Sequence, residues 1–141
     1  MASLCDRQMG GTSGAILSLL FTGMSAALRD SCWKTPTAVW SRALRSAIET
    51  ISKYSLAQPG DRTMLDTLDA VQRCLEQNVG ADVPTVASLV TRAAQDAADK
   101  TANMQALAGR ASYVNAARIS SPDPGAVAVA IWVKAVAAQL M

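Results

Sequence analysis

The sequence predicts a single all-α domain, and two observations predict it: the composition and the spacing of the apolar residues. Half of the 141 residues are hydrophobic, chiefly Ala and Leu, and only 4% are aromatic. Val and Ile are scattered along the chain and do not alternate with polar residues, as they would in half-buried strands. A chain of this length buries about two-thirds of its unfolded surface, so it can form a core of its own.

Apolar residues at helical spacing mark five segments, of which three lie in the first half of the chain. The first helix is expected from about Gly14 to about Leu28 and is apolar nearly all round, which favours a central position. The second and third are expected at about 37–54 and 64–76. Each of these two carries an apolar stripe on one face, as helices on a core do.

The fourth and fifth helices are expected at about 84–106 and from Pro124 to near the C-terminus. Asp123 before Pro124 predicts the start of the fifth, because the carboxylate can cap free N–H groups and the proline ring presets the helical φ. The stretch from Ala126 to Met141 is apolar, but it is short and contains Lys134. We therefore interpret it as a buried helix and not as a membrane span.

The net charge limits the classes of partner the chain could bind, and its cysteines indicate the compartment in which it works. The net charge is +2, too small to imply nucleic acid or an anionic membrane as partner. The local basic pair Arg42 and Arg45 is interpreted as a solvated helix face. Cys5, Cys32 and Cys74 are odd in number and form no CxxC motif, which favours a reducing, cytoplasmic location. No secretory signal is evident in the first residues.

The chain contains no histidine, and this excludes several kinds of catalytic site. Ser-His-Asp triads, Cys-His pairs and histidine-ligated zinc are all ruled out. The GxxxxGK[ST] loop and the catalytic-loop signatures of protein kinases are absent as well. Catalysis would have to use carboxylates, hydroxyls, Arg, Lys, backbone amides or a metal bound by oxygen.

A loop of small residues, Gly10–Gly14, precedes the first expected helix. Its glycines let the backbone turn N–H groups toward a ligand. The helix dipole and the hydroxyls of Thr12 and Ser13 then favour an anion such as phosphate. The alternative is a simple helix cap, with Thr12 or Ser13 as the N-cap residue.

Three later positions also have a structural and a functional interpretation. The turn Pro59–Thr63 is expected to cap the third helix through Asp61 or Thr63. Arg110, flanked by two small residues, would either approach a phosphate closely or lie on the surface. Asp123 is most simply a helix cap.

Taken in order and spacing, four stretches closely resemble the nucleotide-binding domain of dihydroxyacetone kinases: MGGTSGA, PGDRTMLDTL, AGRASYV and DPGAVAVA. The resemblance covers about Met9–Met141. It implies a barrel-like bundle of antiparallel helices, here incomplete, that holds ATP or ADP among loops at one end. It also implies transfer of the γ-phosphoryl group of ATP to a hydroxyl of dihydroxyacetone or glyceraldehyde. Animal members of the family also cleave FAD to a cyclic flavin phosphate at the same site.

The resemblance assigns nucleotide-binding residues position by position. Thr12 and Ser13 match phosphate-contacting positions, and Ser55 and Met64 match positions near the adenine. Arg110 matches an arginine that contacts the nucleotide. Asp123, Pro124 and Gly125 match a loop that closes over it. The full set is Gly10, Gly11, Thr12, Ser13, Ser55, Met64, Arg110, Asp123, Pro124 and Gly125. No catalytic residue and no metal ligand is assigned.

Two parts of the family's kinases are expected to lie outside this chain. The resemblance implies an upstream helical segment whose aspartates hold two Mg²⁺ ions, and a separate domain that binds dihydroxyacetone. The acidic pairs of this chain, Asp66 with Asp69 and Asp96 with Asp99, are interpreted as solvated helix faces. Phosphoryl transfer depends on positioning and on metal ions that neutralise charge, so the chain alone is expected to be inactive.

Two alternatives to an ATP-dependent kinase stay open. One is the bacterial arrangement, in which a bound ADP is rephosphorylated by a phosphocarrier protein. The other is a non-catalytic helical module that binds a partner such as the sister kinase domain, and a homodimer is also left open. Without upstream helices, we expect the first helix to expose an apolar patch around Leu17, Leu20 and Phe21, which would favour association.

Overall fold

The computed structural model describes residues 1–29, 35–114 and 121–140. Within these ranges the secondary structure is helical and contains no strand, which confirms the all-α prediction. The helices are α1 (Ala2–Gln8), α2 (Gly11–Arg29), α3 (Pro36–Tyr54), α4 (Met64–Gln77), α5 (Val83–Lys100) and α6 (Pro124–Ala137), with short 3-10 helices η1 (Thr101–Asn103) and η2 (Arg110–Tyr113).

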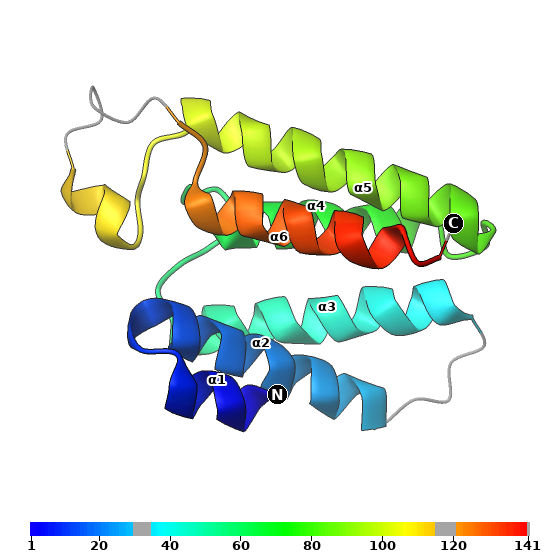
Figure 1. Cartoon of the computed structure of the whole chain (residues 1–141), viewed down its shortest axis with the longest axis horizontal. Helices are drawn as coiled ribbons and strands as arrows, with labels where there is room; N and C mark the ends of the chain where they lie inside the picture. The colour runs from blue at the N-terminus through cyan, green and yellow to red at the C-terminus, as the bar shows by residue number, and fades with distance from the viewer. Residues whose placement is uncertain (30–34, 115–120, 141) are drawn as a thin grey trace.

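The long helices lie side by side and alternate in direction, as Figure 1 shows. α2 packs against α1 and α3, whereas α4 packs against α3, α5 and α6. α5 and α6 also pack against each other. The contact between α3 and α4 therefore joins a group formed by α1 to α3 to a group formed by α4 to α6. Because direction alternates, the connections collect at the two ends of the bundle.

The apolar stripe of α4 holds the two groups together. Leu65 and Leu68 belong to a buried cluster shared with α2 and α3. One turn further, Val71 and Leu75 belong to a second cluster shared with α5 and α6. All four side chains are less than 10% exposed, which confirms the stripe expected from their spacing.

The starts of α4 and α6 follow the capping signals in the sequence. Thr63 and Asp66 form a reciprocal capping box at the start of α4. Asp123 caps α6 by accepting a hydrogen bond from the N–H of Ala126 at 2.9 Å. Asp61, the other candidate cap of α4, instead accepts a hydrogen bond from the backbone of Gln58 within the preceding turn.

Two glycines let α2 approach its neighbours closely. A Cβ on Gly14 would lie 1.9 Å from the carbonyl oxygen of Met9, at the tight turn between α1 and α2. A Cβ on Gly23 would lie 2.7 Å from both the Cα of Ala47 and the carbonyl oxygen of Ser46 on α3. The sequence interpretation placed the need for glycine in the loop before this helix, but the close contacts occur within the helix itself.

By length and composition alone, one helix of the described residues, α2, is long and apolar enough to cross a membrane. It has 19 residues with a mean hydropathy of 1.4, and 22% of the window is buried. A core helix and an N-terminal signal sequence meet the same criterion, so the observation is weak. In this structure α2 packs against α1 and α3.

Three helix boundaries differ from those expected. α1 was not predicted, and α2 begins at Gly11 instead of near Gly14. The fourth predicted helix, 84–106, is too long: α5 ends at Lys100, and after η1 the chain turns extended at Met104. The physical reason is competition from tertiary hydrogen bonds at Thr101, whose carbonyl accepts from Nε of Arg62 and whose hydroxyl accepts the N–H of Asp123.

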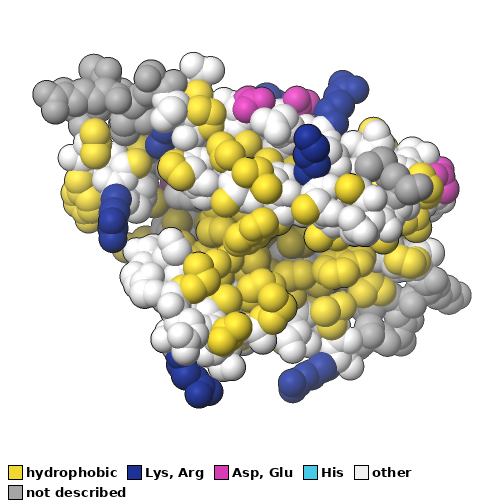
Figure 2. Space-filling model, in the orientation of Figure 1, with side chains coloured by type: hydrophobic (Ala, Val, Ile, Leu, Met, Phe, Trp, Pro, Cys, Tyr) yellow, Lys and Arg dark blue, Asp and Glu magenta, His cyan; other side chains and the backbone are white. Residues whose placement is uncertain are grey.

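An apolar surface runs between α6 and the pair formed by α2 and α3, as Figure 2 shows. The expectation that α2 would expose Leu17 and Leu20 is wrong, because each is only 5% exposed. Several exposed apolar side chains lie on α6. They include Ile131 (60%), Trp132 (44%) and Val136 (57%).

Candidate functional site

The elements that carry the predicted site residues lie at one end of the bundle. These are the turn between α1 and α2, the end of α3, the start of α4, the start of α6 and the nearby helix η2, all on the left in Figure 1. The alternating directions of the helices bring these stretches, distant in sequence, to the same end.

The glycine-rich stretch forms the turn between α1 and α2. Since the helix begins at Gly11, Thr12 and Ser13 lie within its first turn and are not N-cap residues. Both side chains are exposed, and a Cβ on Gly10 or Gly11 would meet no atom within 4 Å. Gly11 has a φ of +70°, which disfavours any side chain there. The stretch therefore presents backbone and hydroxyls to open space at a helix N-terminus.

Ser55 and Met64 flank the connection between α3 and α4. Ser55 is the C-cap residue of α3, and its backbone N–H donates to the carbonyl of Ile51. Its Oγ is buried and has no hydrogen-bond partner among the described residues. A buried hydroxyl without a partner is costly, and a polar ligand atom would satisfy it.

Met64 lies beside the turn at the start of α6. A Cβ on Gly125 would be 3.3 Å from the Cβ of Met64 and 3.0 Å from a carboxylate oxygen of Asp123. The backbone N–H of Asp123 donates to the hydroxyl of Thr101 at 2.8 Å. The structure therefore brings the predicted residues Met64, Asp123 and Gly125 together and anchors them to the end of α5.

Arg110 is the first residue of η2. It is exposed and, within the described part of the chain, takes part in no ion pair or side-chain hydrogen bond that would hold it elsewhere. Gly109, which precedes it, has a φ of +70° that turns the chain into this short helix. The structure places Arg110 near the same end as the other site residues but shows no direct contact between it and the glycine-rich turn.

Sequence reasoning missed Arg62, which organises this end of the bundle. Its side chain is buried, with 3% exposure, and its backbone has a φ of +61°. Nε donates to the carbonyl of Thr101 at 3.0 Å, and one terminal nitrogen donates to the carbonyl of Ser121 at 2.6 Å. Arg62 lies inside one of the four motif stretches, but nothing in its spacing marks it as buried.

One of the acidic pairs differs from its interpretation as a solvated face. Asp66 is half-buried, and its carboxylate accepts hydrogen bonds from the N–H groups of Gly60 at 2.6 Å and Thr63 at 2.7 Å. Asp96 and Asp99 are exposed as expected, facing Arg92 and Gln95 on α5.

Within residues 1–29, 35–114 and 121–140, no three His, Cys, Asp or Glu side chains come together as metal ligands. The residues described therefore do not fit the paired Mg²⁺ ions that the family resemblance implies. Asp61, Asp66 and Asp123, the acidic residues closest to the site in sequence, accept hydrogen bonds from backbone N–H groups.

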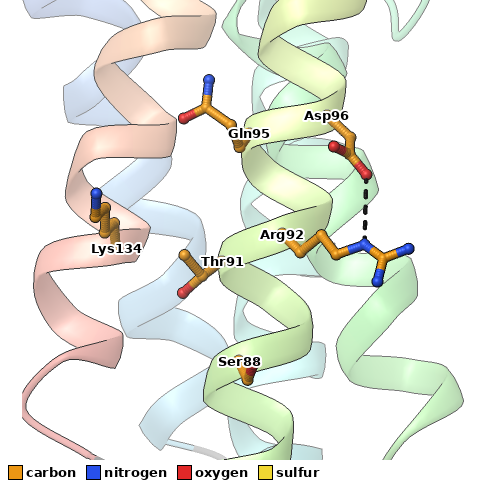
Figure 3. Close-up of a pocket in the computed structure, with 6 residues that line it drawn as sticks. All are labelled: Ser88, Thr91, Arg92, Gln95, Asp96 and Lys134. Carbon is orange, nitrogen blue, oxygen red and sulfur yellow. Dashed lines mark ion pairs between the residues drawn. The ribbon is translucent and has the colours of Figure 1, made fainter.

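A shallow depression of about 340 Å³ lies between α5 and α6, shown in Figure 3. Lys134 of α6 faces Thr91 and Gln95 of α5 across it, whereas Arg92 points away toward Asp96. It contains none of the predicted site residues. Because it is shallow and rests on exposed side chains, it does not compete with the site at the end of the bundle.

The all-α structure agrees with the helical domain that the four motifs predict. The family model described as the DAK2 domain matches residues 1–138, so the chain belongs to the DAK2 domain family. This confirms the resemblance to the nucleotide-binding domain of dihydroxyacetone kinases and extends it over α1.

Curated relatives agree with this assignment. The chain is 44% identical over 138 residues to triokinase/FMN cyclase from Homo sapiens, covering 96% of this chain and 24% of the relative. It is 37% identical to dihydroxyacetone kinase 2 from Saccharomyces cerevisiae, covering 92% and 22%. It is 33% identical to L-erythrulose 1-kinase from Mycolicibacterium smegmatis, covering 93% and 23%. The chain thus spans about a quarter of the length of the relatives it matches.

Proposed function

We propose that this chain is the nucleotide-binding part of a kinase that transfers the γ-phosphoryl group of ATP to a hydroxyl of a triose such as dihydroxyacetone or glyceraldehyde. The observation that carries the proposal is the gathering of the motif stretches at one end of the bundle. The names of the relatives support the substrate class, because they are kinases of small sugars.

The phosphates of the nucleotide would lie at the start of α2. The first N–H groups of a helix have no partner within it, and the helix dipole makes this end positive. The exposed hydroxyls of Thr12 and Ser13 add two donors there. Arg110 would contribute a planar guanidinium that can form two parallel hydrogen bonds to phosphate oxygens.

The adenine would lie near the connection between α3 and α4. The buried Oγ of Ser55 is free to pair with a ring nitrogen or the amino group. Met64 offers an apolar, polarizable surface for the ring face. Gly125, packed against Met64, leaves room for the base that a larger side chain would take up.

The chain alone is expected to bind nucleotide without turning it over. Phosphoryl transfer needs metal ions that neutralise the developing charge, and the described residues offer no cluster of ligands for them. A further segment would supply the metal site, and a sister domain would supply the triose. The family resemblance implies that the same site also takes FAD, and the human relative is named triokinase/FMN cyclase.

We also propose a cytoplasmic location, which free thiols support. Cys5 is buried and Cys74 is half-buried, and neither forms a disulfide. Burial raises the pKa of the Cys74 thiol, which lowers its reactivity at neutral pH.

A second candidate function is partner binding without catalysis, and the exposed apolar side chains of α6 favour it. Ile131, Trp132 and Val136 project from a helix that is apolar on most of its surface. If α6 binds a second copy or a sister domain, Trp132→Lys should lower self-association in sedimentation runs. Unchanged self-association, or a chain that is monomeric from the start, would leave this candidate without support.

Calorimetric titration of ADP tests the proposed function. Arg110→Ala should weaken ADP binding by about 10- to 150-fold, the effect of losing a charged hydrogen bond of roughly 1.5–3 kcal/mol. Arg110→Lys should recover only part, since a point charge cannot reproduce the fork. Arg92→Ala, which removes an exposed arginine of α5 far from the motifs, is the matched control and should change nothing.

Gly11→Val should weaken ADP binding at least as much as Arg110→Ala. A β-branched residue is strained at a φ of +70°, so the turn that presents the N–H groups would distort. The proposal fails if the chain folds but does not bind ADP, or if Arg110→Ala and Arg92→Ala bind it equally well.

A further inference from the structure

Arg62 combines three features that seldom occur together. Its side chain is buried, with 3% exposure, although a charged group is rarely buried unless it is paired. Its backbone lies in the left-handed region, at a φ of +61°, where residues other than glycine are uncommon. Its guanidinium bonds only to backbone carbonyls in the described part of the chain. A strained backbone around a buried cation persists only when the surroundings hold it in place.

The two carbonyls that Arg62 contacts stand at either end of the segment that carries Arg110. Thr101 ends α5 and is 39 residues away from Arg62, and Ser121 precedes the cap of α6 and is 59 residues away. One guanidinium therefore ties the start and the finish of the same segment. The neighbouring carbonyl of Asp61 adds a third tie, because it accepts the N–H of Leu107 at 3.2 Å.

The same contacts reach the turn at the start of α6. Thr101, whose carbonyl accepts from Arg62, also accepts the N–H of Asp123 at its hydroxyl, at 2.8 Å. Arg62 and Met64 are separated by one residue, and Met64 packs beside Gly125. Arg62 is thus connected to Arg110 through the covalent chain and to Asp123 through Thr101.

We propose that Arg62 is a positioning residue of the nucleotide site, which bonds to the carbonyls of Thr101 and Ser121 and so holds the end of α5 against the start of α6, where the Asp123–Gly125 turn lies. This inference rests on the proposed function for its ligand, but the clamp itself does not. The fork geometry of a guanidinium is what allows one side chain to hold two carbonyls from different elements. A lysine could reach one of them but would not span both.

Arg62→Gly is the variant that separates the side chain from the backbone. Glycine adopts a φ of +61° without steric cost, so the substitution removes the side-chain clamp without adding backbone strain. In amide exchange measured without nucleotide, the N–H of Leu107 should exchange at least about tenfold faster. Amides in the middle of α2 and α3 should keep their wild-type rates. ADP affinity by calorimetry should fall by about tenfold or more.

Arg62→Lys is the second variant and guards against loss of the fold. It keeps the positive charge and one hydrogen bond, so it should fall between Arg62→Gly and the wild type in both measurements. Arg73→Gln removes an exposed arginine of α4 and is the control that should leave both unchanged.

Each outcome decides the proposal. Wild-type exchange and wild-type ADP affinity in Arg62→Gly would overturn it, and so would full recovery by Arg62→Lys. Faster exchange throughout all helices would show a general structural role and would also overturn it. If the wild type does not bind ADP, the proposed function fails, yet faster exchange confined to Leu107 and its neighbours would still establish the clamp.

Discussion

The backbone N–H of Asp123 donates a hydrogen bond to the hydroxyl of Thr101, at 2.8 Å and across 22 residues. The same hydroxyl donates to the carbonyl of Ala98 at 2.6 Å, so it closes the end of α5 and fixes the start of α6 at once. Thr101 is fully buried. Two helices of the candidate site therefore depend on one hydroxyl that water cannot replace.

Thr101→Val should destabilise the chain by about 1–3 kcal/mol, because it keeps the shape of the side chain but leaves the part-buried N–H of Asp123 without a partner. Urea unfolding followed by circular dichroism measures the change. Thr101→Ser, which keeps the hydroxyl and loses one methyl group, is the control and should cost less. Equal losses in the two variants would mean that packing, and not the hydrogen bond, is what matters at this position.

Gly23→Ala should destabilise the contact between α2 and α3 although alanine is the better helix former. The added Cβ would lie 2.7 Å from backbone atoms of α3, so the helices must separate, at a cost of about 1–3 kcal/mol. Gly80→Ala is the matched control, because a Cβ there would meet nothing within 4 Å. Thermal unfolding of the two variants decides it, and a Gly23→Ala protein as stable as the wild type would contradict the packing described.

These contacts show where sequence reasoning succeeds and where it stops. Local signals predicted the cap Asp123 and the apolar stripe of α4, and they narrowed the cap of α4 to Asp61 or Thr63, because each depends on residues a few positions apart. The end of α5 at Lys100 could not be predicted, since the next residue, Thr101, bonds to Arg62 and Asp123, partners distant in sequence. Tertiary contacts of this kind produce no periodic pattern in the sequence.

Some residues of the candidate site were predicted from the sequence, and others were not. Resemblance of the motifs marked the glycines, hydroxyls and Arg110, but not Arg62, whose importance lies in carbonyls 39 and 59 residues away. The need for Gly14 was equally hidden, because Met9 approaches it only in the folded turn. Sequence patterns marked the exposed groups proposed to bind a ligand but not the buried groups that support them.

Stability should fall in acid partly through Asp82, the cap of α5. Hydrogen bonds from Thr85 lower the pKa of the Asp82 carboxyl below its usual range. A carboxyl with a lowered folded pKa stabilises the chain fully above its unfolded pKa of about 3.9, and this contribution is lost as the pH falls through the folded value. Asp82→Asn keeps a capping acceptor but does not titrate.

The free energies of unfolding of wild type and Asp82→Asn should therefore differ at pH 7 and converge as the pH falls through the lowered folded pKa of Asp82. Thr85→Val, which removes the donor hydroxyl, should shrink the difference at pH 7. Urea unfolding at a series of pH values measures both. A difference between wild type and Asp82→Asn that stays constant from pH 7 to pH 2 would contradict this assignment.

Mapping the amides that respond to ADP tests the central claim most directly. Hydrogen exchange of the chain, with and without saturating ADP, reports protection residue by residue. The account predicts slower exchange at 10–14, 55–64, 109–114 and 121–126, and unchanged exchange at 76–84 at the opposite end of the bundle. Protection centred on 76–84 or on the depression around Lys134, or no protection under saturating ADP, would contradict a nucleotide site at the end where the four motifs meet.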